Sequence, residues 1–266
     1  MTIDGPTLSV FRAIVFSSLV AGMAAGSAVT VAQQFGTVPM ILKGEVYEAA
    51  ADAASDRAVT GEGAKEADAA RQHSAHGDED SAGPAHHETT WEPKQGWERN
   101  SLTGAANILT SIGFALLLGG IYALRRHVVT WHEGLLWGLA GFAVFTVAPG
   151  LGLPPELPGV PAAALEPRQI WWIATAAATA LGLGLVFLKR SLWASLLGLI
   201  LMALPHLIGA PHLEEVHTNV PEALSHQFVV AVTLTSLLSW ALLGSLTAVA
   251  YARLSAGAPA PIANMH

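Results

Sequence analysis

The sequence contains no cysteine and little charge. The absence of cysteine from all 266 residues excludes a disulfide framework, a thiolate metal site and a cysteine nucleophile. Charged residues make up only 12% of the chain, which is roughly half their share in an average soluble domain. Hydrophobic residues make up 52%, so the composition indicates a membrane protein.

Several motifs that would identify an enzyme are also missing. The chain has no G-x-x-x-x-G-K-[ST] loop for nucleotide hydrolysis, no H-E-x-x-H zinc-protease helix and no G-x-S-x-G nucleophile elbow. Paired histidines inside a membrane span, as bis-imidazole haem ligation requires, are missing as well. The net charge of −7 argues against nucleic-acid binding. We therefore expect a protein that is not an enzyme and that has no nucleic-acid partner.

The hydrophobic residues are concentrated in six runs without Asp, Glu, Lys or Arg. These runs cover residues 13–42, 101–124, 134–155, 169–188, 191–213 and 227–252. A helix needs roughly 20 apolar residues to cross a bilayer, because lipid satisfies no backbone polar group. The sequence therefore predicts an all-α polytopic membrane bundle of about six transmembrane helices. Prolines interrupt the third and fifth runs, which leaves a partly re-entrant path open for them. The first run is longer than the apolar core of a cleaved signal peptide, so it favours a membrane span over a cleaved signal peptide, which is the alternative.

Basic residues in short loops predict the orientation of the spans. They lie before the first run and after the second, fourth and sixth: Arg12, Arg125, Arg126, Lys189, Arg190 and Arg253. Six spans place all of them on one side, so we expect both termini to be cytoplasmic. The first span then lies in residues 1–42, an extracytoplasmic loop covers 43–100, the other spans fill 101–252, and 253–266 form a cytoplasmic tail.

The loop of residues 43–100 carries the net charge of the chain. Thirteen of the twenty acidic residues lie between Lys43 and Arg99 together with six basic residues, a formal charge of −7. Its first part is rich in alanine and capable of forming a helix to about Ala58. Residues 60–90 contain few apolar side chains to offset the entropy of ordering, so we expect them to be disordered without a ligand.

A histidine tract within this loop is a candidate metal-binding segment. Four histidines and four carboxylates lie within the sixteen residues from His73 to Glu88. The histidines are His73, His76, His86 and His87. Imidazole and carboxylate groups both bind cobalt, nickel and zinc, whereas the spacing matches no closed zinc site. The pattern favours a loose, exchangeable capture site, although a solvated acidic loop without a metal role has the same composition.

A second candidate site lies in the predicted outer loops of the bundle. Glu156 is flanked by prolines that restrict its backbone, and His206 and His212 each follow a proline. We expect these three side chains to converge on a metal-admitting mouth, with Arg168 balancing the carboxylate when no metal is bound. The alternative is that they are ordinary hydrogen-bonding loop residues. Trp171 and Trp172 are typical of anchors at the membrane interface, and the Gly22-x-x-x-Gly26 and Gly134-x-x-x-Gly138 patterns favour close helix packing.

Short strings along nearly the whole chain resemble the CbtA family. They are E-V-Y-E at 45–48, G-W-E-R at 96–99, G-L-L-W-G-L-A-G-F at 134–142, G-L-P-P-E-L-P-G at 152–159, R-Q-I-W-W at 168–172, P-H-L-I-G-A-P at 205–211, and Val220-Pro221 followed by Leu224 and Phe228. The fourth and fifth strings are specific, and the order of all of them is preserved. Members of this family are expected to have about five spans, whereas the apolar runs here number six.

The resemblance implies a subunit of a cobalt uptake system in the bacterial inner membrane, associated with cobalamin biosynthesis. It further implies a small CbtB-like partner with one span and a histidine-rich terminus. Cobalt(II) is then the transported substrate, with nickel(II) or zinc(II) as alternatives, and we expect no tightly bound cofactor. Two other functions are compatible with the residues alone. One is a membrane metal chaperone or sensor that does not transport, and the other is a membrane enzyme acting on a lipid or quinone.

Overall fold

The computed structural model describes residues 5–71, 93, 96–125, 129–189, 191–213 and 217–256, and within these it omits the side chains of 5–8, 56 and 58–71. The described part of the chain is helical and contains no β-strand. The helices are α1 (Gly5–Phe35), α2 (Thr37–Arg71), α3 (Trp97–Arg125), α4 (Trp131–Phe142), α5 (Ala148–Gly152), α6 (Leu165–Leu188), α7 (Leu192–Ile208) and α8 (Glu222–Ala256), with a π-helix, η1 (Ala143–Val147), between α4 and α5. The predicted all-α bundle is thus confirmed.

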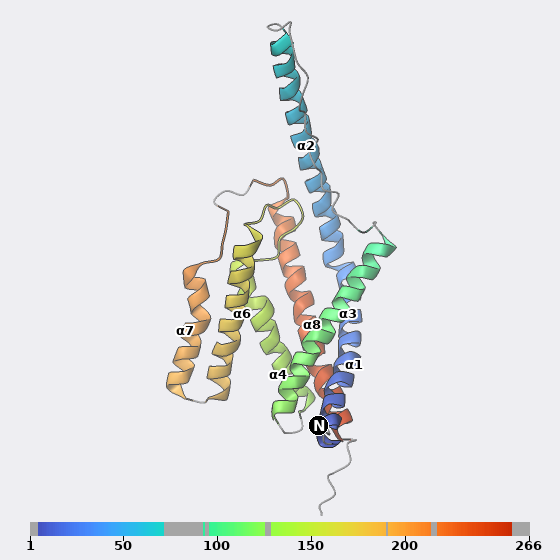
Figure 1. Cartoon of the computed structure of the whole chain (residues 1–266), viewed down its shortest axis with the longest axis vertical. Helices are drawn as coiled ribbons and strands as arrows, with labels where there is room; N and C mark the ends of the chain where they lie inside the picture. Colours follow the sequence, from blue (N-terminus) through green and yellow to red (C-terminus); the bar gives the residue numbers. More distant parts are fainter. Residues whose placement is uncertain are drawn as a thin grey trace, which may run out of the picture.

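Five helical segments are long and apolar enough to cross a membrane. They are Ser9–Phe35, Trp97–Arg125, Trp131–Gly152, Leu165–Leu188 and Glu222–Ala256. The fifth predicted span, in the run 191–213, corresponds to α7, which is apolar but only 17 residues long, at the lower end of the length needed to span. In Figure 1 α7 runs antiparallel along α6, and the N-terminus and the end of α8 lie at the same end of the bundle. The six helical segments of the described chain therefore alternate in direction, and α7 is the short one.

The helix α2 extends the chain well beyond the bundle. It follows α1 after a break at Gly36 and continues to Arg71, and Figure 1 shows its distal half projecting away from the other helices. The expectation of disorder from residue 60 was therefore wrong for residues 60–71. This stretch is composed largely of Ala, Glu, Lys and Arg, all strong helix formers. The rest of the segment expected to be disordered lies outside the described residues.

The third span is not a continuous α-helix. Its α-helical part ends at Phe142, and the π-helix Ala143–Val147 follows before α-helical geometry resumes at Ala148. Pro149 explains the change, because its ring has no N–H and would clash with the carbonyl of Phe145 in a regular helix. One wider π-turn accommodates this clash, and such turns are frequent at functional sites. The span then ends at Gly152, earlier than the predicted residue 155.

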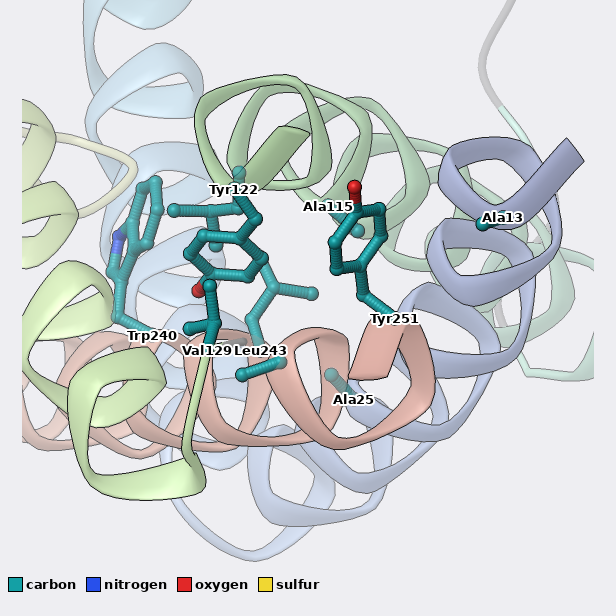
Figure 2. Packing of buried hydrophobic residues seen from close by; sticks show 10 residues of the cluster. Ala13, Ala25, Ala115, Tyr122, Val129, Trp240, Leu243 and Tyr251 are labelled. Atoms are coloured by element: carbon teal, nitrogen blue, oxygen red, sulfur yellow. The ribbon is translucent and has the colours of Figure 1, made fainter. Parts of the chain in front are cut away.

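The core of the bundle lies between α1, α3 and α8. Figure 2 shows the rings of Tyr122 and Tyr251 side by side in this space, with Leu243 and Trp240 beside them; the two tyrosine ring centroids are 6.3 Å apart. The hydroxyl of Tyr122 donates a hydrogen bond to the carbonyl oxygen of Gly244 at 3.2 Å. This contact ties α3 to α8 inside the membrane-spanning part of the chain.

Glycines allow the helices around this core to approach closely. A Cβ atom on Gly22 or Gly26 would lie 2.6 Å from the backbone of α3, at Ile112 and Ile108 respectively. A Cβ atom on Gly134 would lie 2.5 Å from the carbonyl oxygen of Gly244 on α8. The packing role predicted for both small-residue patterns is therefore confirmed.

Candidate metal entrance and polar chamber

Glu156 lies in the proline-rich connection between α5 and α6 and forms an ion pair. Arg168, in the first turn of α6, donates from its guanidinium to the Glu156 carboxylate at 2.9 Å. Both side chains are partly exposed, at 30% and 28%. The connection is held in place by Leu157, which is 3% exposed. The predicted balancing of Glu156 by Arg168 is therefore observed.

His206 lies in the last turn of α7 and packs against Trp171 of α6. The two ring centroids are 5.7 Å apart in an edge-on arrangement. The indole N–H of Trp171 donates to the carbonyl oxygen of Pro205 at 3.1 Å. Trp171 is only 8% exposed, so its expected role as an interface anchor was wrong: its ring packs between helices instead. A Cβ atom added to Gly152 would lie 2.3 Å from this ring, so glycine is the residue that leaves room for it.

These contacts place Glu156 and His206 near one face of α6. Arg168 and Trp171 are three residues apart on this helix, and residues at that spacing are neighbours on a helix surface. His212 lies in the exposed connection after α7. Within the described residues no group of three or more histidine or carboxylate side chains could hold a metal ion, so Glu156, His206 and His212 do not converge in this structure. His73, His76, His86 and His87 lie outside the described residues.

A pocket of about 500 Å³ lies between the helices of the bundle and is partly open to the outside; we call it the chamber. Its walls come from α1, α2, α3, η1, α6 and α8, and they combine aromatic and aliphatic side chains with amides and hydroxyls. The polar residues are Gln33, Thr37, Asn107, Thr110, Ser111, Thr146, Thr235, Ser236 and Ser239. Among its described lining residues none is acidic, basic or a histidine. The chamber therefore offers only neutral oxygen and amide groups to a bound ion or to water.

Two sets of hydrogen bonds organise the chamber wall. The hydroxyls of Thr146 and Ser236 are 2.7 Å apart and link the π-helix η1 to α8. The side-chain amide of Asn107 donates to Gln33 Oε1 at 2.7 Å and to Thr30 Oγ1 at 3.1 Å, linking α3 to α1. Sequence reasoning missed this site because it followed ionisable residues. The available signal was the recurrence of small polar residues three and four apart within apolar runs, at 107, 110 and 111 and at 235, 236 and 239.

An apolar cluster lies between the chamber and the connections at the end of the bundle where α2 leaves it. Leu157, Val220 and Phe228 are buried together, with Ile41 and Val232 packed against them. Phe228, Ile41 and Val232 also line the chamber. The cluster is therefore a plug between the chamber and the connection that carries Glu156.

Backbone contacts hold this plug together. The hydroxyl of Thr218 donates to the carbonyl oxygen of Gly159 at 2.7 Å and accepts from the backbone N–H of Val220 at 3.1 Å. Gly159 has a φ of +81°, and a Cβ atom there would lie 3.1 Å from the backbone nitrogen of Glu48. Gly44 approaches the same loop, since its Cβ atom would lie 3.0 Å from the carbonyl oxygen of Pro158. The base of α2 is thus packed against the connection between α5 and α6.

Comparison with known proteins identifies the family. The model of the CbtA family, described as a probable cobalt transporter subunit, matches residues 11–252. No curated protein and no solved structure shows significant similarity to the chain. The matched range begins within α1 and ends within α8, and it includes the residues that line the chamber, Glu156 and His206. The chain therefore belongs to the CbtA family of probable cobalt transporter subunits.

Proposed function

We propose that this chain is the membrane subunit of an uptake system for divalent cations that favours cobalt, and that the ion crosses the bilayer through the polar chamber. The observation that carries this proposal is the chamber itself. Polar side chains at membrane depth are costly when they face lipid and are found lining water-filled paths or sites. A cavity of about 500 Å³ with nine hydroxyl or amide residues in its wall is the kind of space that a translocated ion requires.

The outer histidines and Glu156 then supply the capture step. The tract containing His73, His76, His86 and His87 would raise the local concentration of the metal. Glu156, His206 and His212, which do not converge in this structure, would move together around the ion at the outer end of the bundle before it enters. Because Arg168 neutralises Glu156 in this structure, a cation bound by Glu156 would displace the guanidinium. A site of few protein ligands releases its metal readily, as a transport site must.

The metal preference and the driving force come from different sources. Imidazole and carboxylate ligands bind nickel, zinc and copper as well as cobalt, so the preference for cobalt rests on the family to which the chain belongs. The chain has no P-loop for nucleotide hydrolysis. A membrane potential of 100 mV favours inward movement of a divalent cation by about 4–5 kcal/mol, at roughly 2.3 kcal/mol per charge. We therefore propose uptake driven by the potential, in the inner membrane, with the tract on the outside.

The family description also names the chain a subunit. We propose that its partner is a CbtB-like protein with a single span and a histidine-rich terminus. Such a terminus would add metal ligands next to the capture tract, and so would shorten the time an ion spends unbound between capture and entry.

Cobalt uptake into proteoliposomes tests the proposal. The purified chain, with and without its partner, should accumulate cobalt(II) when the lumen is made negative. Ser236→Phe should abolish uptake by filling the chamber. Leu234→Phe is the matched control, because Leu234 lies two residues away on α8 and is 59% exposed on the outside of the helix. Absence of uptake under all conditions, with folded protein that still binds cobalt, would favour the metal chaperone or sensor instead.

A further inference from the structure

A second cavity adjoins the chamber on the side of α1, α2 and α3. It has a volume of about 280 Å³ and is lined by the end of α1, the first turns of α2 and the first turns of α3. Its lining residues include Gly96, Arg99 and Thr103, and we call it the vestibule. Gln33, Thr37 and Ile41 line both the vestibule and the chamber. These three residues therefore form the partition between the two spaces.

One side of this partition is locked by hydrogen bonds. The side-chain amide of Asn107 donates to Gln33 and to Thr30, so both of its N–H groups are engaged. The hydroxyl of Thr30 in turn donates to the carbonyl oxygen of Gly26 at 2.8 Å. Gln33 is thus held by a chain of bonds that reaches across α1 and α3. The partition also stands at the break between α1 and α2, where Gly36 interrupts the helix, so a change in the angle of α2 would act on it directly.

We propose that Gln33 and Asn107 form a gate through which a divalent cation passes from the vestibule into the chamber with its first shell of water intact. This inference rests on the proposed transport function and assigns its route. Passage opens when the bond between the two amides breaks and Gln33 leaves the partition. The plug around Leu157 and Phe228 keeps the Glu156 side of the chamber closed, so the ion captured there enters by way of the vestibule.

The chemistry of the walls selects a hydrated ion. A bare divalent cation needs anionic or imidazole ligands to replace its water, and the described lining of the chamber provides neither. Amide and hydroxyl groups can instead accept and donate hydrogen bonds to bound water. Six waters occupy roughly 180 Å³ at roughly 30 Å³ each, which fits within the chamber of about 500 Å³. In the vestibule the charge of Arg99 is offset by its ion pair with Glu45, which reduces its repulsion of a cation.

The absence of cysteine from the chain allows a direct test of the gate by cysteine accessibility in lipid nanodiscs. Single cysteines are placed in the vestibule (Thr103→Cys), in the chamber (Ser236→Cys) and on the lipid-facing side of α7 (Ile200→Cys). Ile200 is 62% exposed and serves as the control. A small charged methanethiosulfonate reagent should modify T103C rapidly, S236C at least tenfold more slowly, and I200C hardly at all. Adding Asn107→Ala should raise the rate at which the reagent modifies S236C at least tenfold and leave the rate for T103C unchanged.

Gln33→Ala provides a second way of breaking the same bond if Asn107→Ala does not fold. If neither substitution changes the rate at which S236C is modified in folded protein, the gate would be overturned. The hydration of the ion is tested with hexaamminecobalt(III), whose six ligands do not exchange. It should protect S236C in the Asn107→Ala background as cobalt(II) does. Protection by cobalt(II) alone would show that the ion sheds its water and would overturn the hydrated route.

These outcomes are separable from the proposed function, because accessibility is measured without transport. A reactive, gated S236C in a chain that takes up no cobalt would refute transport and leave the gate standing. If the chain takes up cobalt but the reagent never modifies S236C, the gate would be refuted and the transport function would stand.

Discussion

Arg168 donates a hydrogen bond to the carboxylate of Glu156 at 2.9 Å, and this pair is close to the packing of Trp171 on His206 because Arg168 and Trp171 are neighbours on α6. A carboxylate from the connection between α5 and α6 and an imidazole from the last turn of α7 therefore both contact α6. The guanidinium holds the carboxylate in place while no cation is present. Under the proposed function, a metal ion binding at Glu156 would compete with Arg168, and this competition would weaken the affinity and speed release.

Replacing the two ligands should impair capture and leave the route through the bundle intact. Glu156→Gln and His206→Ala should each raise the half-saturating cobalt concentration by about tenfold, corresponding to the loss of roughly 1.4 kcal/mol of binding. The maximal rate should change little, and the abundance of the protein in the membrane should stay normal. Initial rates of cobalt uptake over a range of concentrations measure both quantities.

Glu222 and His226 provide the matched control for this experiment. They form an i, i+4 contact at 3.8 Å at the start of α8, and both are largely exposed. Glu222→Gln and His226→Ala should leave the concentration dependence unchanged. A loss of membrane abundance in the Glu156 or His206 variant would instead support a role in holding the loops together.

The histidine tract should act on the same step with a smaller effect. Replacing His73, His76, His86 and His87 together by alanine should raise the half-saturating concentration and leave the maximal rate nearly unchanged. A tethered capture segment supplies effective concentration and does not form the path through the membrane. Uptake kinetics measured with normalised protein abundance check this, and a collapse of the maximal rate would place the tract in the conduction path.

The membrane helices could be predicted from the sequence because apolar length is a direct physical requirement of the bilayer. The first run predicts α1, and the pairing of Arg168 with Glu156 follows from their charges and their common side of the membrane. The packing of Gly134 and Gly138 against α8 followed from their small size. These features depend on residue type and on spacing along the chain, both of which a single sequence displays.

The chamber, the π-helix and the burial of Trp171 could not be predicted in the same way. The chamber combines residues from six segments, and its polar groups are neutral, so no segment stands out alone. Pro149 signals a disturbance of its helix, but a kink, a break and a π-turn all satisfy the same proline. The interface position of Trp171 is typical of a lipid anchor, and only the approach of α7 and Gly152 places it inside. The early end of α7 comes from Gly209, whose φ of +90° stops the helix before Pro211.

The orientation of the bundle in the membrane is a further prediction. The ends of α3 and α6 lie at the same end of the bundle as the end of α8, and in the sequence basic residues lie at or directly after each of these helix ends. This end of the bundle should therefore face the cytoplasm. A fluorescent reporter that matures only in the cytoplasm should be bright after Arg126 or Ala252, and alkaline phosphatase should be active when fused near Pro161. An active phosphatase after Ala252 would rule out six spans.

The contact between α4 and α8 should be the part of the bundle least tolerant of added volume. A Cβ atom on Gly244 would lie 2.2 Å from the carbonyl oxygen of Gly134 and 2.8 Å from the backbone of Gly138. Backbone atoms cannot rotate away as a side chain can, so the two helices must separate. Gly244 also supplies the carbonyl that accepts the Tyr122 hydroxyl, and separation would strain that bond as well.

Gly244→Ala should therefore destabilise the bundle by about 1–3 kcal/mol, the usual cost of overpacking a core. Gly184→Ala on α6 is the control, since nothing lies within 4 Å of its Cβ position. Alanine there should be neutral or stabilise the helix by roughly 0.5–1 kcal/mol, because glycine loses more backbone freedom on folding. The midpoint of thermal unfolding in detergent, read by size-exclusion chromatography, should fall for G244A and not for G184A. Equal midpoints for both variants would mean that α4 and α8 can move apart freely. The contact between these two helices would then not fix the wall of the chamber formed by η1 and α8.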